Sequence, residues 1–200
     1  MSFKFGFEVE GFFVNNEDVI TLPPERYNHD DFPGLAEART VGGDEIDVQY
    51  YMMLMEMDKL TGVDFSLHQH TFTPREKASI RARHYEKGGV SINNVYGKAP
   101  KSLGNKTIAS FQINFSDLSE DLNLSLSNNS QFRRKLFRIF DFVEIIRNLD
   151  EEFRAEITDS GRQPGFYSVK DGVRVEYRSL PNFVVTQPPQ TVIKRIKKCF

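Results

Sequence analysis

The stretch FKFGFEVEGFFV, residues 3–14, has the pattern of a central β-strand with one charged face. Side chains alternate across a strand, so Glu8 and Glu10 project from one face while Phe7 and Val9 project from the other. The phenylalanines around the two glutamates favour a strand packed inside a sheet over a solvated edge strand. We therefore expect a sheet with an apolar back and a front that carries carboxylates.

A second stretch near the other end of the chain, GVRVEYRSLPN at 172–182, has the same alternation. Its charged face carries Arg174, Glu176 and Arg178, and the valines and tyrosine between them point the other way. Two guanidiniums that flank a carboxylate suit a bound phosphate. The same residues also suit a self-neutralising ladder, in which the arginines pair with Glu176 or with a neighbouring strand.

Composition limits the classes of function. The 200 residues suit one domain, 1–200, and the 39% hydrophobic and 27% charged residues are typical of a globular protein. A net charge of −2 gives no electrostatic reason to expect a nucleic-acid or membrane partner, and no apolar stretch is long enough to cross a bilayer. The one cysteine, Cys199, excludes internal disulfides, and the first residues lack a secretory pattern, so we expect a cytoplasmic location.

The rest of the chain predicts an α+β domain with a mainly antiparallel sheet. Strands are expected at 3–14, 19–22, 35–41, 63–72, 106–115, 166–169 and 173–180, and helices at 46–60, 74–86, 131–155 and 188–200. The segment 90–105 contains glycine, lysine, asparagine and proline throughout and is expected to be a loop.

The motif F-G-x-E-x-E-x-F at 5–12 and the run RQPGFYSVKDGVRVEYRSLPN at 162–182 resemble one particular family. It is the phage-type branch of carboxylate–amine ligases (amidoligases), within the glutamine synthetase and glutamate–cysteine ligase superfamily. The resemblance covers most of the chain in the order of its elements, and specific residues match in a few short segments. It implies a curved, mainly antiparallel sheet with helices packed on one face, and a polar concave face that holds divalent metals and ATP.

The resemblance also implies a role for each glutamate. Glu8 and Glu176 would bind one Mg²⁺ or Mn²⁺ ion near the β- and γ-phosphates of ATP, and Glu10 and Glu37 would bind another. Carboxylate oxygens are the ligands that Mg²⁺ prefers.

The arginines would handle the other negative charges. Arg178 would neutralise the phosphoryl group during transfer, and Arg174 would contact phosphate or the substrate carboxylate, so these two and Glu176 would be the catalytic residues. Arg39 lies two residues from Glu37 on the same strand face and would contact substrate, and Arg162 would add anion binding from a loop.

One strand departs from the superfamily pattern. Where glutamine synthetase has a His-x-His pair that helps to hold metal, this chain has Gln112 and Asn114, which would then help to bind the cofactor. Amide oxygens bind a divalent metal less strongly than imidazole or carboxylate. Three explanations remain open: fewer protein ligands, compensation by His68 and His70 on another strand, or degraded activity.

The activity implied by the resemblance is ATP- and Mg²⁺-dependent ligation of a carboxylate to an amine through an acyl phosphate. The substrates would be small molecules or peptides, and the protein would act as a monomer or small homo-oligomer in the cytoplasm, the host's if the gene belongs to a phage. Two alternatives remain open: a non-catalytic nucleotide- or protein-binding protein on the same fold, and a phosphotransferase that stops at phosphorylation.

Overall fold

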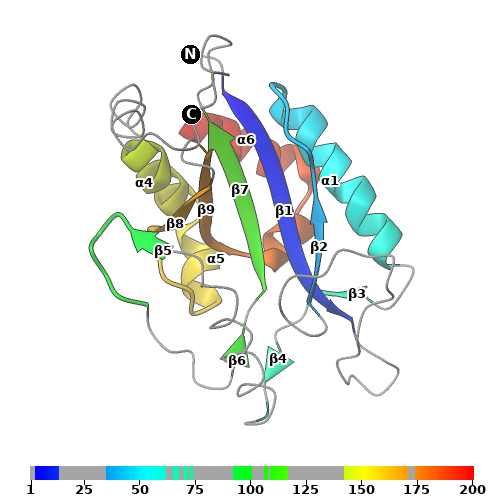
Figure 1. Cartoon of the computed structure of the whole chain (residues 1–200), viewed down its shortest axis with the longest axis horizontal. Coiled ribbons are helices and arrows are strands. Elements are labelled where there is room, and N and C mark those ends of the chain that lie inside the picture. Colours follow the sequence, from blue (N-terminus) through cyan, green and yellow to red (C-terminus); the bar gives the residue numbers. More distant parts are fainter. Residues whose placement is uncertain are drawn as a thin grey trace.

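A computed structural model describes residues 3–13, 35–61, 65–67, 70–71, 73, 92–100, 106–107, 109–116, 142–170 and 174–200. These residues form an α+β fold with an open, antiparallel sheet and a few helices (Figure 1). The described strands are β1 (Lys4–Phe13), β2 (Leu35–Arg39), β3 (Phe65–Ser66), β4 (His70–Thr71), β5 (Ile92–Asn94), β6 (Lys106–Thr107), β7 (Ser110–Ser116), β8 (Phe166–Lys170) and β9 (Arg174–Pro181). The described helices are α1 (Ile46–Thr61), α4 (Phe142–Glu152), α5 (Arg154–Asp159), α6 (Pro189–Cys199) and the 3₁₀ helix η3 (Asn182–Thr186).

The main sheet brings the two ends of the sequence together. Its strand order is β2-β1-β7-β9-β8-β5, and β3 pairs with the far end of β1. Strand β7 therefore lies between β1 and β9, the two strands whose charged faces the sequence predicted. A second, two-stranded sheet is formed by β4 and β6.

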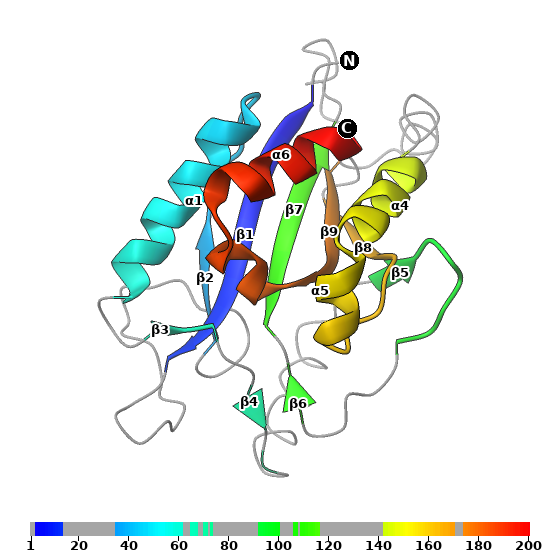
Figure 2. The same ribbon diagram turned by 180° about the vertical axis from the view of Figure 1, so that it is seen from behind.

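The described helices pack on one side of the main sheet, which we call the back. Figure 1 views the sheet from the opposite side, the front, and Figure 2 shows α1, α4, α5 and α6 lying over the back. Because each helix carries an apolar stripe, these stripes and the apolar side chains of the strands are removed from water together. Fully buried members of this core include Phe7, Tyr50, Met53, Phe111, Ile113, Ile146, Leu149, Val175, Tyr177 and Ile196.

The register aligns the polar residues of the front in rows across the strands. Glu8 on β1 lies opposite Arg39 on one side and Gln112 on the other. Asn114 on β7 lies opposite Gly6 on one side and Glu176 on the other. Residues far apart in the sequence therefore become neighbours on one face.

A β-bulge interrupts the pairing of β7 with β9. Phe111 pairs with Leu180 and Ile113 pairs with Tyr177, so that Arg178 and Ser179 together lie opposite the single residue between them on β7. Residues three apart on a regular strand face opposite sides of the sheet, and the bulge lets Tyr177 and Leu180 face the same side. Both are buried in the core, which keeps the charged part of β9 on the front.

Two predicted strands are divided in the structure, so the prediction of continuous strands was wrong. Residues 63–72 contain β3, which pairs with β1, and β4, which pairs with β6 in the second sheet. Residues 106–115 divide between β6 and β7 in the same way. Alternation of polar and apolar residues does not show where a chain leaves one sheet for another, because the pairing partner lies elsewhere in the sequence.

The prediction of a loop at 90–105 was also wrong in part, because this segment contains strand β5. Ile92 pairs with Ser168 of β8, and the Asn94 side chain donates to the Pro164 carbonyl at 2.9 Å. Asparagine is unfavourable in strands by propensity, so this short strand depends on tertiary pairing and has no strong local signal.

The long helix predicted at 131–155 differs from the structure at its carboxyl end. Helix α4 ends at Glu152, and after Phe153 the chain continues as α5 to Asp159, so helical structure extends four residues beyond the predicted end. The predicted helix at 188–200 is confirmed by α6. Residues 131–141 and the elements predicted at 19–22 and 74–86 lie outside the described residues.

Candidate active site

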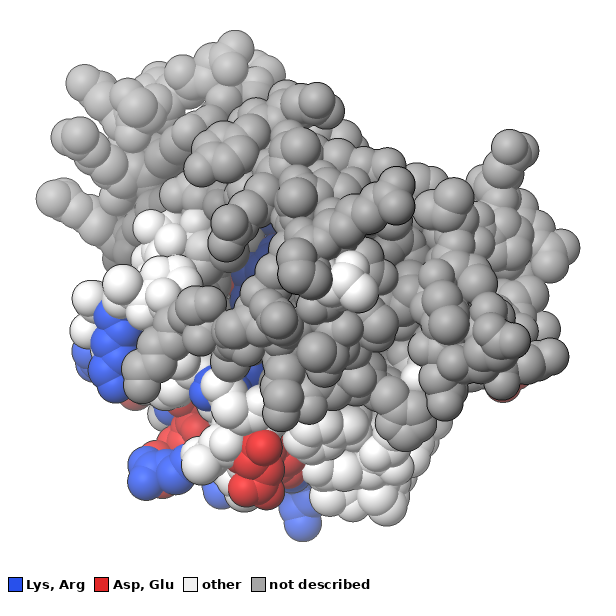
Figure 3. Space-filling view, turned by 90° about the horizontal axis from the view of Figure 1, so that it is seen from below, with Lys and Arg blue, Asp and Glu red and all other residues white. Residues whose placement is uncertain are grey.

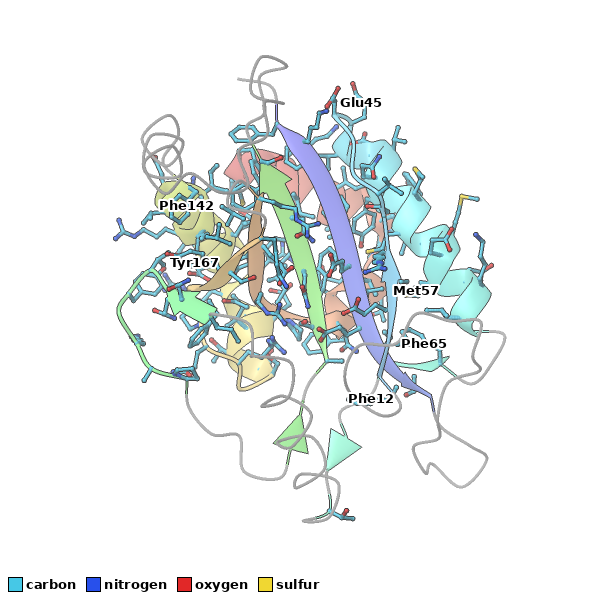
Figure 4. All side chains as sticks on the ribbon, in the orientation of Figure 1. Phe12, Glu45, Met57, Phe65, Phe142 and Tyr167 are labelled. Atoms are coloured by element: carbon cyan, nitrogen blue, oxygen red, sulfur yellow. The ribbon has the colours of Figure 1, made fainter. Side chains whose placement is uncertain are left out.

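The front of the sheet carries buried polar side chains from three adjacent strands. Glu10 comes from β1, Gln112 and Asn114 from β7, and Glu176 from β9, and each of them is buried. Glu8 lies among them and is half-buried. Figure 4 draws the described side chains on the ribbon, and no described helix covers this face. Burial of charged groups is unfavourable without compensation, so the partners of each carboxylate decide what the group can do.

Glu10 is held by a set of donors from β7. Its Oε2 accepts hydrogen bonds from the Ser110 backbone N–H at 2.7 Å and from the Ser110 hydroxyl at 2.6 Å, and its Oε1 accepts from Gln112 Nε2 at 2.6 Å. The Arg178 guanidinium adds a charged contact, with Nη2 3.9 Å from Oε1. These hydrogen bonds and the charged contact offset the cost of burying the Glu10 carboxylate.

Glu176 is compensated mainly by cations. Arg178 Nη1 donates to its Oε1, the Ser168 hydroxyl donates to the same oxygen at 2.9 Å, and Lys170 Nζ lies 3.6 Å from Oε2. The ladder that the sequence left open is therefore partly formed, because Arg178 bridges Glu176 and Glu10.

Glu8 is less well compensated than these two. Asn114 Nδ2 donates to its Oε1 at 3.1 Å. Burial raises the pKa of Glu8, the negative charges of Glu176 and Glu10 raise it further, and Arg174 and Lys170 act in the opposite direction. A cation placed near Glu8 would therefore relieve an existing electrostatic penalty.

Glu37 and Arg39 extend the polar face onto β2. Glu37 pairs directly with Glu10 across the strands, and Arg39 Nη1 lies 4.0 Å from Glu37 Oε2. Like charges in directly opposite positions repel each other, so a cation is favourable at this pair. The Arg39 side chain is more than half exposed and remains accessible to a ligand from solvent.

Arg162, which the resemblance assigns to anion binding, contacts the backbone of β9. Its Nε and Nη2 donate to the backbone carbonyls of Ser179 and Arg178 at 3.1 and 2.6 Å. Burial lowers the pKa of Arg162, and the nearby charge of Glu10 raises it. Two of its donors thus hold the bulge that carries Arg178, which makes Arg162 a support for the site.

Two amide oxygens on β7 are buried without a described donor. Gln112 Oε1 and Asn114 Oδ1 accept no hydrogen bond from any residue that the structure describes. A buried acceptor left without a partner costs about 1–3 kcal/mol. Both are hard oxygen atoms, of the kind that Mg²⁺ binds, and each belongs to a side chain that also donates to a glutamate.

The oxygen atoms of these side chains are suitable ligands for a divalent cation. Glu8 and Glu176 would supply carboxylate oxygens, and Asn114 would supply its amide oxygen. Within the described ranges, no group of three or more His, Cys, Asp or Glu side chains is arranged around one metal position. His68 lies outside the described residues, and so does the side chain of His70.

A pocket of about 330 Å³ opens at the end of the sheet where β1 begins and β7 ends. Arg174 is among its lining residues, together with Asn114. Figure 3 views the molecule from the opposite end of the sheet, where basic side-chain atoms are visible at the centre and further basic and acidic side chains gather toward the lower left.

The structure brings together most of the residues that the sequence selected. Strands β1, β7 and β9 place Glu8, Glu10, Gln112, Asn114, Arg174, Glu176 and Arg178 on one face, and β2 adds Glu37 and Arg39. Sequence reasoning missed Ser168 and Lys170, which contact Glu176 from β8. Ser168 lies in the strand predicted at 166–169 and Lys170 directly follows it, so their spacing of two residues was the available signal.

Comparisons with known proteins leave the family unassigned. The chain matches no protein-family model, no curated protein and no solved structure. No described helix is both long enough and apolar enough to span a membrane.

Proposed function

We propose that this protein is an ATP- and Mg²⁺-dependent ligase that joins a carboxylate to an amine. The observation that supports this proposal most is the buried polar cluster on β1, β7 and β9. It combines carboxylates with arginines and with two amide oxygens that lack a described donor. Such a cluster is costly to bury unless a ligand completes it, and a nucleotide with Mg²⁺ carries charges of both signs.

The proposed chemistry has two steps. An oxygen of the substrate carboxylate attacks the γ-phosphorus of ATP, the bond to the β-phosphate oxygen breaks, and ADP leaves. The nitrogen of an amine then attacks the acyl phosphate, inorganic phosphate leaves, and a proton passes to solvent. Activation is needed because a carboxylate is a poor electrophile, and no side chain has to act as a nucleophile.

The roles of the residues follow from their charges. Mg²⁺ would neutralise the phosphates, and Glu8, Glu176 and Asn114 would hold it with hard oxygen atoms. A second cation would lie between Glu10 and Glu37, which face each other across the strands.

Two arginines complete the proposed site. Arg178 would exchange part of its contact with Glu176 for the transferred phosphoryl group, whose negative charge is spread over three equatorial oxygens in the transition state. Arg39 is exposed enough to contact the substrate.

The finer features implied by the resemblance belong to the same proposal. We infer a sheet of the glutamine synthetase type in one domain, acting in the cytoplasm as a monomer or small homo-oligomer. The net charge of −2 supports a small-molecule or peptide substrate over nucleic acid.

One observation favours the non-catalytic alternative. Glu10 and Glu176 already have protein partners, so part of the cluster is stable without a metal. A binding protein on this fold would keep the ladder and its affinity for a nucleotide but would not transfer a phosphoryl group. The phosphotransferase alternative differs only in its second step.

The first test is calorimetric titration with a non-hydrolysable ATP analogue, with and without Mg²⁺. Wild-type protein should bind the analogue in a Mg²⁺-dependent manner, and Glu8→Gln/Glu176→Gln should lose this binding. Glu56→Gln is the matched control, since it makes the same substitution on the exposed side of α1. The proposal fails if the wild type does not bind, or if the double variant binds as tightly as the wild type.

The second test separates ligase from phosphotransferase. ADP release that requires both a carboxylate and an amine supports the ligase, whereas ADP release with the carboxylate alone supports the phosphotransferase. Arg178→Ala should lower kcat by at least about 100-fold, the loss typical when one group that stabilises transition-state charge is removed.

A further inference from the structure

The pocket at the end of the sheet opens on the same face as the polar cluster. Lys4 and Gly6 precede Glu8 at intervals of two residues on β1, so the three share the front of the strand. Asn114 and Ser116 line the pocket from β7, in register with Gly6 and Lys4. The upper end of β1 and β7 in Figure 1 marks its place.

Basic side chains gather at this end of the sheet. Lys4 and Arg174 line the pocket, and Lys170 pairs with Arg174 across β8 and β9. The described lining residues include no aspartate or glutamate; they are Lys4, Phe5, Gly6, Thr40, Val41, Gly42, Asn114, Phe115, Ser116 and Arg174. A pocket with basic residues, hydroxyl groups and an amide, and without an acid among its described lining, favours an anion.

The size of the pocket favours a small molecule. Its volume of about 330 Å³ lies at the lower end of the range for small-molecule sites. A whole nucleoside triphosphate is too large for this volume and would extend out of the pocket along the sheet. An organic acid of a few carbon atoms would fit inside.

Gly6 contributes to the open space. A Cβ atom added at Gly6 would meet Asn114 Cβ at 3.6 Å, Thr40 Oγ1 at 3.7 Å and the Gly42 Cα at 3.8 Å, which are ordinary contact distances. All three neighbours line the pocket. A Cβ atom at this position would therefore point into the pocket at ordinary contact distances.

The pocket lies directly beside the proposed reaction site. Glu8 follows Gly6 by two residues on β1, a distance of about 7 Å along a strand. Asn114 belongs to both places, since it lines the pocket and donates to Glu8, while its Oδ1 accepts no described hydrogen bond. A molecule bound in the pocket would thus have one end close to Glu8 and Glu176.

We infer that this pocket binds a small organic acid, with a carboxylate group at the Lys4–Arg174 end. This inference rests on the proposed ligase function, for which it supplies the site of the carboxylate substrate. Gly6 sets the size of the acid, and Lys4 and Arg174 select its charge.

Chemical-shift titration of the protein with succinate provides the test, and neutral succinamide of the same shape is the control for charge. Succinate should shift the amide signals of residues in the pocket, and succinamide should bind at least tenfold more weakly. Gly6→Val should weaken succinate binding at least tenfold, because its side chain occupies the pocket. Circular dichroism and the Tm of Gly6→Val check that the variant folds.

A second pair of variants tests charge without filling the pocket. Lys4→Gln should weaken succinate binding about fivefold, whereas Lys194→Gln, on the exposed side of α6, should leave it unchanged. Equal binding of succinate and succinamide would overturn the inference. Unchanged binding in both folded Gly6→Val and Lys4→Gln would also overturn it.

Titration with inorganic phosphate tests whether the pocket binds a phosphate group instead of a carboxylate. If phosphate binds the pocket more tightly than succinate does and displaces it, the pocket holds a phosphate group and the inference is wrong. Titration of wild-type protein with the Mg²⁺–ATP analogue separates the two proposals. Succinate binding without nucleotide binding would refute the proposed ligase function but not the acid-binding pocket. Nucleotide binding without succinate binding would refute only the acid-binding pocket.

Discussion

The two faces of strand β7 are buried to nearly the same degree, but by different side chains. On β7, Phe111 and Ile113 face the back and are 0% exposed, while Gln112 and Asn114 face the front and are 1% and 2% exposed. Burial of the back is driven by removal of apolar surface from water. Burial of the front has no such driving force and requires hydrogen bonds, charge pairs or a ligand.

This difference separates residues that contribute to the apolar core from residues whose burial needs another explanation. An apolar residue on the back is explained by the core that it fills, although the helix-covered side also holds buried polar atoms without a described partner, Gln49 Oε1, Tyr50 Oη and Asp150 Oδ2. Front-facing residues are explained only in part by their partners, because Glu8 has a raised pKa and the two amide oxygens accept no described hydrogen bond. Incomplete compensation on a buried face is typical of a binding site.

The largest expected effect is on the back of β7. Phe111→Ala should lower the free energy of unfolding by about 3–5 kcal/mol, because it opens a cavity beside the rings of Phe7 and Tyr50. Urea denaturation of both proteins measures the difference. Gln112→Leu is the matched change one residue away on the front, and the comparison of the two faces fails if it is equally destabilising.

A smaller effect is expected at Asp150, a buried polar residue behind the sheet. Asp150 is buried there, and it accepts hydrogen bonds from Tyr177 Oη at 2.7 Å and from the Gly165 backbone N–H at 3.0 Å. Tyr177→Phe should lower the free energy of unfolding by about 1–3 kcal/mol, because it removes one donor from a buried carboxyl group.

The pH dependence of Tyr177→Phe gives a further check. Burial raises the pKa of Asp150, and the hydrogen bond from Tyr177 opposes that rise. The variant should therefore have a still higher pKa at Asp150. Its loss of stability should grow as the pH rises through that pKa, and a loss that does not change with pH would contradict this account.

Glu8→Gln should have an effect of the opposite sign. Since burial raises the pKa of Glu8, this group contributes stability below its ordinary value of 4.5 and loses that contribution as the pH rises through the folded pKa. Glutamine does not titrate, so the variant should have the higher Tm at neutral pH without metal or nucleotide. The advantage should disappear in acid, and a variant less stable than the wild type at neutral pH would show that Glu8 is well compensated.

The smallest effect is expected at an exposed charge pair. Arg154 donates to Glu151 on the outer side of the α4–α5 region, and both side chains are about 70% exposed. Arg154→Gln should change the free energy of unfolding by no more than about 0.5 kcal/mol, because water and salt screen such pairs. Arg178→Gln removes the arginine of the buried pair with Glu176 and should destabilise more. Equal effects in urea denaturation would mean that the front is not electrostatically distinct.

The sequence predicted which residues share a face of the sheet wherever charged and apolar residues alternate strongly. Strands β1 and β9 lie at the predicted positions, and helix α6 occupies the predicted range. Alternation of charged and apolar residues is a local signal, and it is sufficient to assign a face. The glutamates and arginines of both strands could therefore be selected before any pairing was known.

Other features of the site have no local signal. Strand β5 consists of Ile92–Asn94, and it forms because β8 pairs with it from far along the sequence. The bulge at Arg178 and Ser179 depends on the register between β7 and β9. Arg162 has the sequence context of an exposed loop arginine, yet two of its donors bind the backbone of that bulge.

The sequence by itself determined which residues are charged, which strand face they occupy and which segments are apolar enough to form a core. Only the tertiary structure decided that β7 lies between β1 and β9, that Asn114 is shared by the pocket and the glutamates, and that Glu37 opposes Glu10. The physical reason is that alternation depends on neighbouring residues, whereas strand order and register depend on the packing of the whole chain.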